Sequence, residues 1–435
     1  MPKQSGFEAY TKQLETLAID RLRAETPGEN LKNAVTVALD GGSSAALRRS
    51  VSIDKRRELG AYFTPSSLAN ETVQLFEEHV PTSVTFMDSS CGAGDLLLAA
   101  ARLLPVRRTL SETLAVWNTQ LVGFDLQEEF VRAAKVRLFL LAIERGCTVD
   151  LKSIPPNTKF FPLLTNGNGL DDAVNYTGVT HITINPSFSK QQAPEGCTWA
   201  TERVSSAAVF LYDCVSRALE GTKIVAILPD VLRSGSNYSK WRSEIVKRAT
   251  IEEVKIIGKF DRWTDVDVFL IRLTVGKARA EASTQWWNGV RNSQDIMIGD
   301  RFEIEVGRVV PHRDSMKGPW WPYIYSRVVP QWQTVREFPN HRRFAGKVFK
   351  PPFVAVRRTS RTGDQYRAVG SVICGKKKVA VENHLMVLTP KDGLVRTCHE
   401  LLDVLRAAQT NDWLNERIRC RHLTVPALKE VLYQS

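Results

Sequence analysis

Between residues 56 and 278, short apolar runs alternate with longer segments in which apolar residues recur at helical spacing. Parallel strands need a crossover connection of a dozen or more residues, usually a helix, so this alternation is typical of a parallel sheet covered by helices. The stretch therefore predicts an α/β domain with strands at "VTFMDSS", "TQLVGFDLQ", "THITINPSF", "KIVAILPDVL", "EEVKIIGKF" and "DVDVFLIRLTVG".

The remainder of the 435-residue chain differs from this stretch on both sides. Residues 1–55 carry helical periodicity interrupted at Pro27-Gly28 and Gly41-Gly42, which predicts an N-terminal helical segment. After Gly276 the sequence is rich in Trp, Pro and Arg, with short apolar strands and a last helix over "LLDVLRAAQTNDWLNERI". We therefore predict an α/β domain at 56–278 and a mixed α+β domain at 279–435, whose core includes Trp286, Trp287, Trp320 and Trp321.

Membrane and disulfide-linked classes are disfavoured by the composition. No run of about 18 apolar residues occurs, and the first residues contain no apolar signal-peptide core, so we expect a soluble, cytoplasmic protein with no membrane partner. The seven cysteines are scattered, without a Cys-x-x-Cys pair or a Cys/His cluster at zinc spacing. We expect reduced thiols and no bound metal.

Basic residues are in excess, and the excess is concentrated late in the chain. The formal net charge is +12, and between His341 and Ala380 eleven basic residues stand against one acid, Asp364. Such a distribution favours a polyanionic partner that is bound by the second domain.

The segment "DSSCGAGDLLLAAARLL", from Asp88 to Leu104, joins the first predicted strand to a helix through two glycines. In an open α/β sheet such a turn lets the backbone approach a ligand beyond the carboxyl end of the strand. A nicotinamide dinucleotide fold would have a third glycine at position 97, where this chain has Leu97. Asp125 ends the next strand and is placed to accept both hydroxyl groups of a ribose. A ribose-bearing ligand without a pyrophosphate therefore fits this pattern.

A second polar segment, "NPSF", follows the strand "THITI". The residue before a proline avoids helical angles, and proline fixes its own φ, so Asn185 is held extended and points into the crevice. The side chain of Asn185 and the carbonyl of Pro186 are two acceptors that can take both protons of one exocyclic amine. Phe188 offers a flat face on which a base can stack.

In their order along the chain, these segments resemble those of the gamma-class adenine-specific (N6) DNA methyltransferases of restriction-modification systems, over about residues 56 to 275. "GAYFTP" (60–65) resembles the family segment that wraps the methionine end of the cofactor. "DSSCGAGDL" resembles its glycine-rich turn, "GFDLQ" its ribose-binding acid, and "NPSF" its N-P-P-Y/F catalytic tetrapeptide. The resemblance implies a Rossmann-like class I S-adenosylmethionine-dependent methyltransferase sheet, followed by a C-terminal target-recognition domain.

The resemblance also implies a role for individual residues, with S-adenosylmethionine as cofactor, duplex DNA as partner and no metal. The catalytic residues would be Asn185, Pro186 and Phe188. A flipped adenine would stack on Phe188 and on a second aromatic residue, Phe260 or Trp263. The cofactor would be bound by Tyr62, Thr64, Pro65, Asp88, Cys91, Gly92, Gly94, Asp125, Leu126 and Asn168. DNA phosphates would be bound by the run from Arg357 to Arg367, including Arg358 and Arg361, and by Lys376, Lys377 and Lys378.

Three residues depart from the family pattern. Ser89 and Ser187 stand where the family has prolines, which predicts less rigid turns, and Asn168 stands where an Asp often accepts from the adenine amine of the cofactor. Two other functions stay open on the sequence: an RNA adenine methyltransferase, and a methyltransferase-like DNA-recognition subunit that no longer catalyses. We find no nuclease motif, so any cutting is expected to belong to a separate restriction nuclease. We expect a bacterial or phage-encoded protein that is associated with the nucleoid when it is bound to DNA. The target sequence and the oligomeric state are not predicted.

Overall fold

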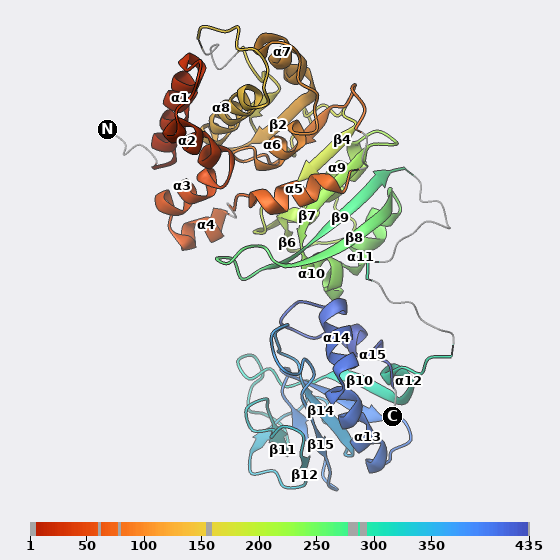
Figure 1. Cartoon of the computed structure of the whole chain (residues 1–435). Coiled ribbons are helices and arrows are strands. Elements are labelled where there is room, and N and C mark those ends of the chain that lie inside the picture. The colour runs from red at the N-terminus through yellow and green to blue at the C-terminus, as the bar shows by residue number, and fades with distance from the viewer. Residues whose placement is uncertain are drawn as a thin grey trace. The chain divides into compact units, whose positions relative to one another are not determined.

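The structure is a computed structural model that describes residues 6–59, 62–76, 80–153, 159–276, 286–287 and 294–433. The chain folds into two compact units (Figure 1). Unit 1 comprises Met1–Leu232 and Ser239–Thr284, and unit 2 comprises Arg233–Tyr238 and Gln285–Ser435. The boundary predicted at residue 278, and Gly60 and Ala61 of "GAYFTP", lie outside the described residues.

Unit 1 contains a seven-stranded sheet in the order β3-β2-β1-β4-β7-β9-β8. The first five strands of this order are parallel, whereas β9 pairs antiparallel with both β7 and β8. A short antiparallel hairpin, β5–β6, was not predicted from the sequence. The strands are β1 (Phe86–Asp88), β2 (Leu121–Asp125), β3 (Leu164–Asn166), β4 (His181–Ile184), β5 (Lys190–Gln192), β6 (Arg203–Ser205), β7 (Lys223–Pro229), β8 (Ala249–Lys259) and β9 (Asp267–Val275).

Burial along these strands follows their position in the sheet. Every residue of β1 and β4 is buried, whereas the edge strand β8 contains many half-exposed residues. A strand that is covered on both faces of the sheet needs consecutive apolar residues, because neither face contacts solvent. This explains why the segments that form the central strands are apolar without a regular polar alternation. The predicted α/β sheet is therefore confirmed, and the carboxyl ends of β1, β2 and β4 lie side by side in it.

Helices accompany the sheet in two groups. In the first group, α5, α6 and α8 contact strands of the sheet, and α6 contacts both α5 and α8. In the second group, α9 contacts β7, α11 contacts β8, and the two helices contact each other. The helices of this region are α5 (Ser66–Gln74), α6 (Asp95–Ala101), α7 (Leu110–Gln120), α8 (Glu128–Glu144), α9 (Ser206–Arg217) and α11 (Ser239–Val246). Between α9 and α11 in the sequence, α10 (Asp230–Ser234) spans the boundary at Leu232, and the 3-10 turn η1 (Ser236–Tyr238) belongs to unit 2.

The N-terminal segment forms α1 (Gly6–Arg23), α2 (Glu29–Leu39), α3 (Gly42–Ser50) and α4 (Ile53–Leu59), with breaks at the predicted glycines. These helices belong to unit 1. The buried guanidinium of Arg137 on α8 donates to the carbonyls of Ala38 and Ala93 and pairs with Asp95 at 2.8 Å. A single buried arginine therefore joins the N-terminal segment to the start of α6.

Unit 2 contains a five-stranded sheet, β10-β17-β14-β15-β12, and a three-stranded sheet, β13-β11-β16. Residues of β14 alternate between two cores: Val354 and Val356 pack with the helices, and Phe353 and Ala355 pack with the smaller sheet. The strands are β10 (Phe302–Val306), β11 (Trp320–Ile324), β12 (Thr334–Val335), β13 (His341–Arg343), β14 (Phe353–Arg357), β15 (Gly370–Ile373), β16 (Ala380–Val381) and β17 (Leu385–Pro390).

Three sequence predictions for unit 2 need correction. The last helix is two helices, because Ala407 is extended with ψ of 140° and ends α13. Arg367 is 1% exposed and donates to Ser360, Asn415 and Cys420, so it is a core residue and not a phosphate ligand. Trp320 is 58% exposed and does not belong to the core. The helices are α12 (Ile298–Arg301), α13 (Val395–Arg406), α14 (Ala408–Arg417) and α15 (Val425–Lys429).

Neither a membrane span nor a metal cluster occurs in the described part of the chain. No helix within the described residues is long and apolar enough to cross a membrane. The same residues contain no group of three or more His, Cys, Asp or Glu side chains that could hold a metal ion.

Candidate functional site

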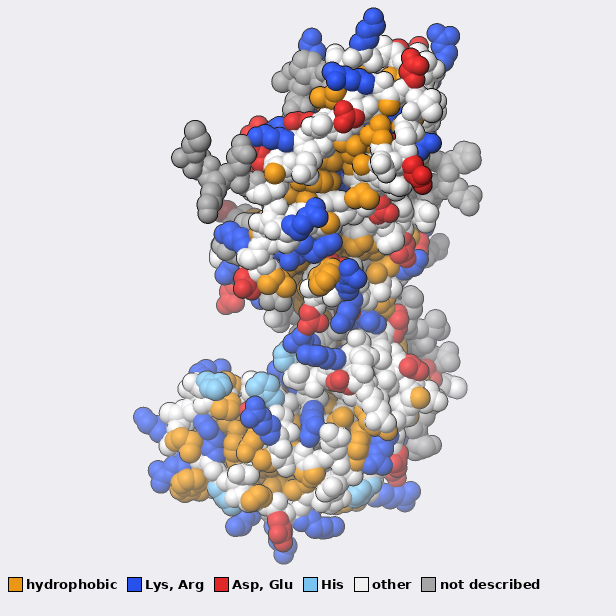
Figure 2. Space-filling view, turned by 60° about the vertical axis from the view of Figure 1, so that its left-hand side comes forward, with side chains coloured by type: hydrophobic (Ala, Val, Ile, Leu, Met, Phe, Trp, Pro, Cys, Tyr) orange, Lys and Arg blue, Asp and Glu red, His pale blue; other side chains and the backbone are white. Residues whose placement is uncertain are grey.

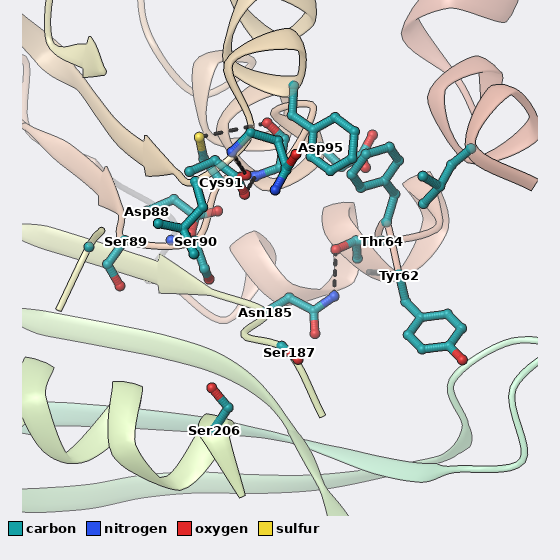
Figure 3. A pocket seen from close by; sticks show the side chains of 18 of the residues that line it. Tyr62, Thr64, Asp88, Ser89, Ser90, Cys91, Asp95, Asn185, Ser187 and Ser206 are labelled. Carbon is teal, nitrogen blue, oxygen red and sulfur yellow. Dashed lines mark hydrogen bonds between the residues drawn. The ribbon is translucent and has the colours of Figure 1, made fainter. Parts of the chain in front are cut away.

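A cavity of about 630 Å³ lies in unit 1 where the chain leaves β1, β2, β3 and β4 (Figure 3). Of the residues predicted to bind the cofactor, eight line it: Tyr62, Thr64, Asp88, Cys91, Gly92, Asp125, Leu126 and Asn168. Asn185 lines it as well, so the segments that are separated in the sequence meet around one space. Pro65, Gly94, Pro186, Phe188 and Phe260 are not among its lining residues.

The glycine-rich turn is held by local hydrogen bonds. Asp88 is buried, and its carboxylate accepts from the backbone N–H of Ser90 at 2.9 Å, which closes an Asx turn in place of the family's proline. The backbone N–H of Cys91 donates to the Phe124 carbonyl at 2.8 Å. Gly92 has φ of +51°, and a Cβ there would lie 3.0 Å from the ring of Phe63. These hydrogen bonds therefore hold the turn in place, although Ser89 replaces the proline of the family pattern.

Gly94 approaches a neighbouring helix closely, and its predicted contact with the cofactor stays a prediction. Its φ is +85°, and a Cβ at this position would lie 2.9 Å from the Cβ of Ala134 on α8. The second glycine thus permits close packing of the turn against a neighbouring helix and does not face the cavity.

Asp125 lies at the end of β2, and both carboxylate oxygens accept backbone hydrogen bonds. Oδ2 accepts from Gly92 at 3.0 Å, and Oδ1 accepts from Gln127 at 2.9 Å. Burial raises the pKa of Asp125 above its ordinary value. Each oxygen keeps one further lone pair, so Asp125 can still accept from two hydroxyl groups of a ligand. Leu126 beside it is 69% exposed, an apolar surface at the mouth of the cavity.

The loop after β3 completes this side of the cavity. Asn168 accepts a hydrogen bond from the Leu170 N–H at Oδ1, which leaves one lone pair of that oxygen for a ligand. Gly169 approaches the Ser89 carbonyl so closely that a Cβ would lie 1.9 Å from its oxygen. Sequence reasoning missed Gly169, although the repeated glycines of "NGNG" were a signal for a close backbone approach.

Asn185 follows β4, and its carboxamide is oriented by one hydrogen bond. Nδ2 donates to the Thr64 hydroxyl at 2.9 Å, and Figure 3 shows the two side chains pointing toward each other. Oδ1 is buried and has no hydrogen-bond partner. A buried acceptor without a partner costs about 1 to 3 kcal/mol, so this oxygen marks a place for a hydrogen-bond donor.

The missing second proline of the tetrapeptide is replaced by hydrogen bonds. The Ser187 hydroxyl accepts from the Ser189 N–H at 3.1 Å and donates to the Ser189 hydroxyl at 2.7 Å. Such a turn restricts the backbone as a Ser/Thr turn does. The loop after Asn185 is therefore ordered by a different interaction from the one in the family pattern.

The two candidate stacking residues of the β8–β9 hairpin differ in environment. Phe260 is 3% exposed and packs edge to face on Phe188, with ring centroids 5.4 Å apart. Trp263 is 51% exposed, and the guanidinium of Arg262 lies 4.6 Å from its ring centroid. Phe260 thus supports the ring of Phe188, whereas about half of the Trp263 side chain faces solvent. Contact of either with a base stays a prediction.

One wall of the cavity comes from the N-terminal helices, for which the sequence indicated no role. Phe7 on α1, Leu47 on α3 and Lys55 on α4 all line it. Amphipathic periodicity reports only that a helix has a buried face, and no motif in residues 1–55 signals a ligand. Four acids also line the cavity, with Lys55 as the one basic lining residue in the described part of the chain: Asp88, Asp95, Asp125 and Glu129.

In unit 2, the predicted DNA-binding residues differ in exposure. Lys376, Lys377 and Lys378 are exposed between β15 and β16, and Arg361 is exposed as well. Arg357 and Arg358 are half-buried, and Arg357 donates to the Val329 carbonyl. On the face of unit 2 that Figure 2 shows, Lys and Arg side chains are frequent and acidic side chains are sparse.

Comparison with known proteins gives concordant results. The model of the N-6 DNA Methylase family matches residues 47–288, more than half of the chain. The type II methyltransferase M.BsuBI of Bacillus subtilis is 22% identical over 215 residues, a match that covers 48% of this chain and 41% of that relative. This chain thus matches less than half of the relative's length.

Among solved structures, the type IIL restriction-modification enzyme MmeI in complex with DNA is similar with a TM-score of 0.56 and 12% identity, over 98% of this chain and 82% of that chain. A putative class I S-adenosylmethionine-dependent methyltransferase from Listeria monocytogenes has a TM-score of 0.42 and 14% identity, over 63% of this chain and 81% of that one. The predicted fold class, a class I methyltransferase sheet with a C-terminal α+β part, is confirmed. The chain belongs to the N-6 DNA Methylase family, the N6-adenine DNA methyltransferases of restriction-modification type.

Proposed function

We propose that the protein transfers a methyl group from S-adenosylmethionine to the N6 amino group of an adenine that is flipped out of a specific duplex DNA sequence. It would act as the modification enzyme of a restriction-modification or phage-defence system, alongside a separate nuclease. The observation that carries this proposal is the buried, unpartnered Oδ1 of Asn185, which lies at the edge of the cavity formed by the glycine-rich turn and Asp125.

The charges of the cavity fit S-adenosylmethionine. Asp125 and, once it has lost its proton, Asp88 favour a ligand that carries an ammonium and a sulfonium charge, whereas the lining acid Asp95 is already paired with Arg137. Asp125 would bind the ribose, Leu126 and Asn168 the adenine, and Asp88 with Tyr62 the methionine end. When bound, this cofactor would supply an electrophilic methyl group. Methyl transfer from this cofactor would require no metal ion.

Asn185 and Pro186 would activate the target amine. The lone pair of an adenine amino group is delocalised into the ring, which makes the nitrogen a poor nucleophile. Hydrogen bonds from the two N–H groups of this nitrogen to Asn185 Oδ1 and to the Pro186 carbonyl favour a pyramidal nitrogen with a localised lone pair. The contribution of these residues is orientation, with reacting atoms held about 3 to 3.5 Å apart.

The base must leave the duplex to reach Asn185, which costs a few kcal/mol. Stacking on an aromatic ring is worth roughly 1 to 3 kcal/mol per base and offsets much of this cost. Phe188 is held for this contact by Phe260. We infer that unit 2 supplies most of the duplex contacts, because its exposed lysines and arginines can neutralise phosphates.

The direct test is single-molecule sequencing of DNA from cells that carry the gene, compared with cells that carry an inactive variant. We expect N6-methyladenine at one sequence motif in the first sample alone. Methylation of RNA without methylation of DNA would favour the RNA enzyme. No methyl transfer to either by the purified chain would favour the silent recognition subunit.

The charge of Asp88 predicts a proton release on cofactor binding. Burial raises the pKa of Asp88 to about 8, against the lowering effect of the hydrogen bond from Ser90. Between about pH 4 and pH 8, Asp88 is therefore protonated in the folded chain and ionised in the unfolded chain. Through that window this group makes the ligand-free protein less stable as the pH rises. A cationic ligand favours the carboxylate and expels the proton.

We therefore expect binding of S-adenosylmethionine at pH 7 to release close to one proton. The affinity should rise between pH 6 and about 7.5, a range in which the α-amino group of the ligand is still charged, because its ordinary pKa is higher. Calorimetry in two buffers of different ionisation enthalpy measures the release. The Asp88→Asn variant should release none and should be more stable above pH 7 while binding more weakly. A binding enthalpy of the wild type that is equal in both buffers would contradict this assignment.

The exposed lysine loop of unit 2 predicts a salt-dependent contribution to DNA binding. Replacement of Lys376, Lys377 and Lys378 by Ala should make the decrease of log affinity with log salt less steep by about 2 to 3 units of slope. The reason is that each neutralised phosphate contributes about 0.9 to the magnitude of that slope. A control should remove the same charge from exposed lysines of unit 1, at Lys12, Lys32 and Lys247. Loss of affinity confined to one DNA sequence would instead indicate base readout by the loop.

A further inference from the structure

We propose that Thr64 is a positioning residue for methyl transfer, which orients the Asn185 carboxamide so that Oδ1 and not Nδ2 meets the target amine. This inference rests on the proposed function. The resemblance implies that Thr64 binds the cofactor, which stays a prediction. In the structure its hydroxyl oxygen accepts the hydrogen bond from Asn185 Nδ2 at 2.9 Å.

Orientation matters because the two ends of a carboxamide have opposite hydrogen-bonding character. The oxygen only accepts and the nitrogen only donates, and rotation by 180° about the Cβ–Cγ bond exchanges them. A rotated Asn185 would present N–H groups to the N–H groups of adenine, which cannot bond to each other. A threonine hydroxyl can donate or accept, and here it accepts from Nδ2, which holds the carboxamide with Oδ1 free of protein partners. The target amine offers only donors to this side chain, so the amine and the contact with Thr64 together select the productive orientation.

Thr64 can fix Asn185 because its own segment is held on two sides. The side chain of Thr64 is 6% exposed. The preceding Phe63 packs on Phe7 and Phe130 with ring centroids 5.6 and 4.9 Å away, and its ring lies against Gly92. The following residue, Pro65, is the N-cap of α5, and its carbonyl accepts from the Ala69 N–H in the first turn of that helix. The acceptor therefore has a defined position before any ligand binds.

The test compares Thr64→Val, which keeps the shape and removes the acceptor, with Thr64→Ser, which keeps the hydroxyl. We expect kcat to fall about 10- to 100-fold in Thr64→Val, since small misplacements of reacting groups have effects of this size. The Kd for S-adenosylmethionine should stay within about twofold of the wild type. Thr64→Ser should restore kcat to within about threefold.

Thr72→Val is the matched control. Thr72 is also buried and lies in α5 close by in sequence, but its hydroxyl donates to the Leu68 carbonyl, away from the cavity. Its replacement removes a threonine hydroxyl of equal burial and should leave kcat unchanged. A similar fall of kcat in both variants would show a general loss of packing and would overturn the proposal.

A second readout does not depend on activity. In protein labelled with 15N-asparagine, the Asn185 side-chain amide is identified by its absence in Asn185→Asp. We expect one of its two protons to lie downfield in the wild type and in Thr64→Ser, and the two shifts to converge in Thr64→Val, because the hydrogen bond to Thr64 is lost.

The two readouts separate this inference from the proposed function. If the wild type transfers no methyl group but the amide signature behaves as expected, the proposed function fails and the orienting contact holds. If Thr64→Val retains full kcat, or if its only effect is on the Kd for the cofactor, Thr64 is not a positioning residue. Unchanged Asn185 resonances in Thr64→Val lead to the same conclusion.

Discussion

Replacement of Asn185 by Ala should lower kcat by about 10²- to 10³-fold while the affinity for duplex DNA stays near that of the wild type. The reason is that Asn185 Oδ1, buried and without a protein partner, would bond to the target amine most strongly as that nitrogen becomes pyramidal. An interaction made chiefly in the transition state affects kcat rather than binding. Removal of one such preorganised polar group from an active site has effects of this size.

Single-turnover methylation of duplex DNA measures the rate, and a fluorescence titration measures the affinity. Asn70→Ala is a suitable control, because Asn70 is a half-buried asparagine with one side-chain hydrogen bond, from Arg102, and does not line the cavity. We expect this control to retain the wild-type rate. Normal turnover in Asn185→Ala would contradict the proposed chemistry, and loss of both rate and DNA affinity would indicate a role in binding.

Replacement of Gly169 by Ala should weaken binding of S-adenosylmethionine by about 100-fold or more and lower the melting temperature. The added Cβ would lie 1.9 Å from the Ser89 carbonyl oxygen, a backbone atom that cannot rotate away. The loop after β3 must then move off the glycine-rich turn, and the adenine side of the cavity opens. Overpacking of this kind costs typically 1 to 3 kcal/mol of stability.

The same loop contains the control. A Cβ at Gly167 would meet no atom within 4 Å, and its φ does not lie in the left-handed region, although this glycine also lines the cavity. Gly167→Ala should therefore bind S-adenosylmethionine as the wild type does. Calorimetry on both variants decides the matter, and equal affinities for the two would show that the contact between Gly169 and Ser89 does not shape the cavity.

The sequence predicted those parts of the site that depend on short segments. A proline restricts the residue before it, so two residues predicted that Asn185 points into the crevice, and Asn185 does line the cavity. A strand, a glycine turn and a helix in immediate succession likewise predicted that Asp88 and Gly92 line a cavity. These inferences succeeded because local backbone geometry, set by neighbouring residues, determines them.

Other features depend on residues far apart in the chain. Whether Phe260 or Trp263 is exposed depends on the neighbours that tertiary packing brings to each ring. Their positions in the sequence do not distinguish the buried ring from the exposed one. Arg367 lies within a basic run, yet it is buried by polar partners from another part of unit 2. Side-chain chemistry alone does not distinguish a surface arginine from one that satisfies buried carbonyls.

The sequence by itself determined the α/β sheet and predicted several residues that line the cavity, because periodicity, proline and glycine act over a few residues. Only the tertiary structure decided that N-terminal helices wall the cavity, that Gly169 meets Ser89, and that Thr64 orients Asn185 across 121 positions of the chain. Contacts of that sequence separation are set by how the elements pack, and no local pattern records which side chains will meet.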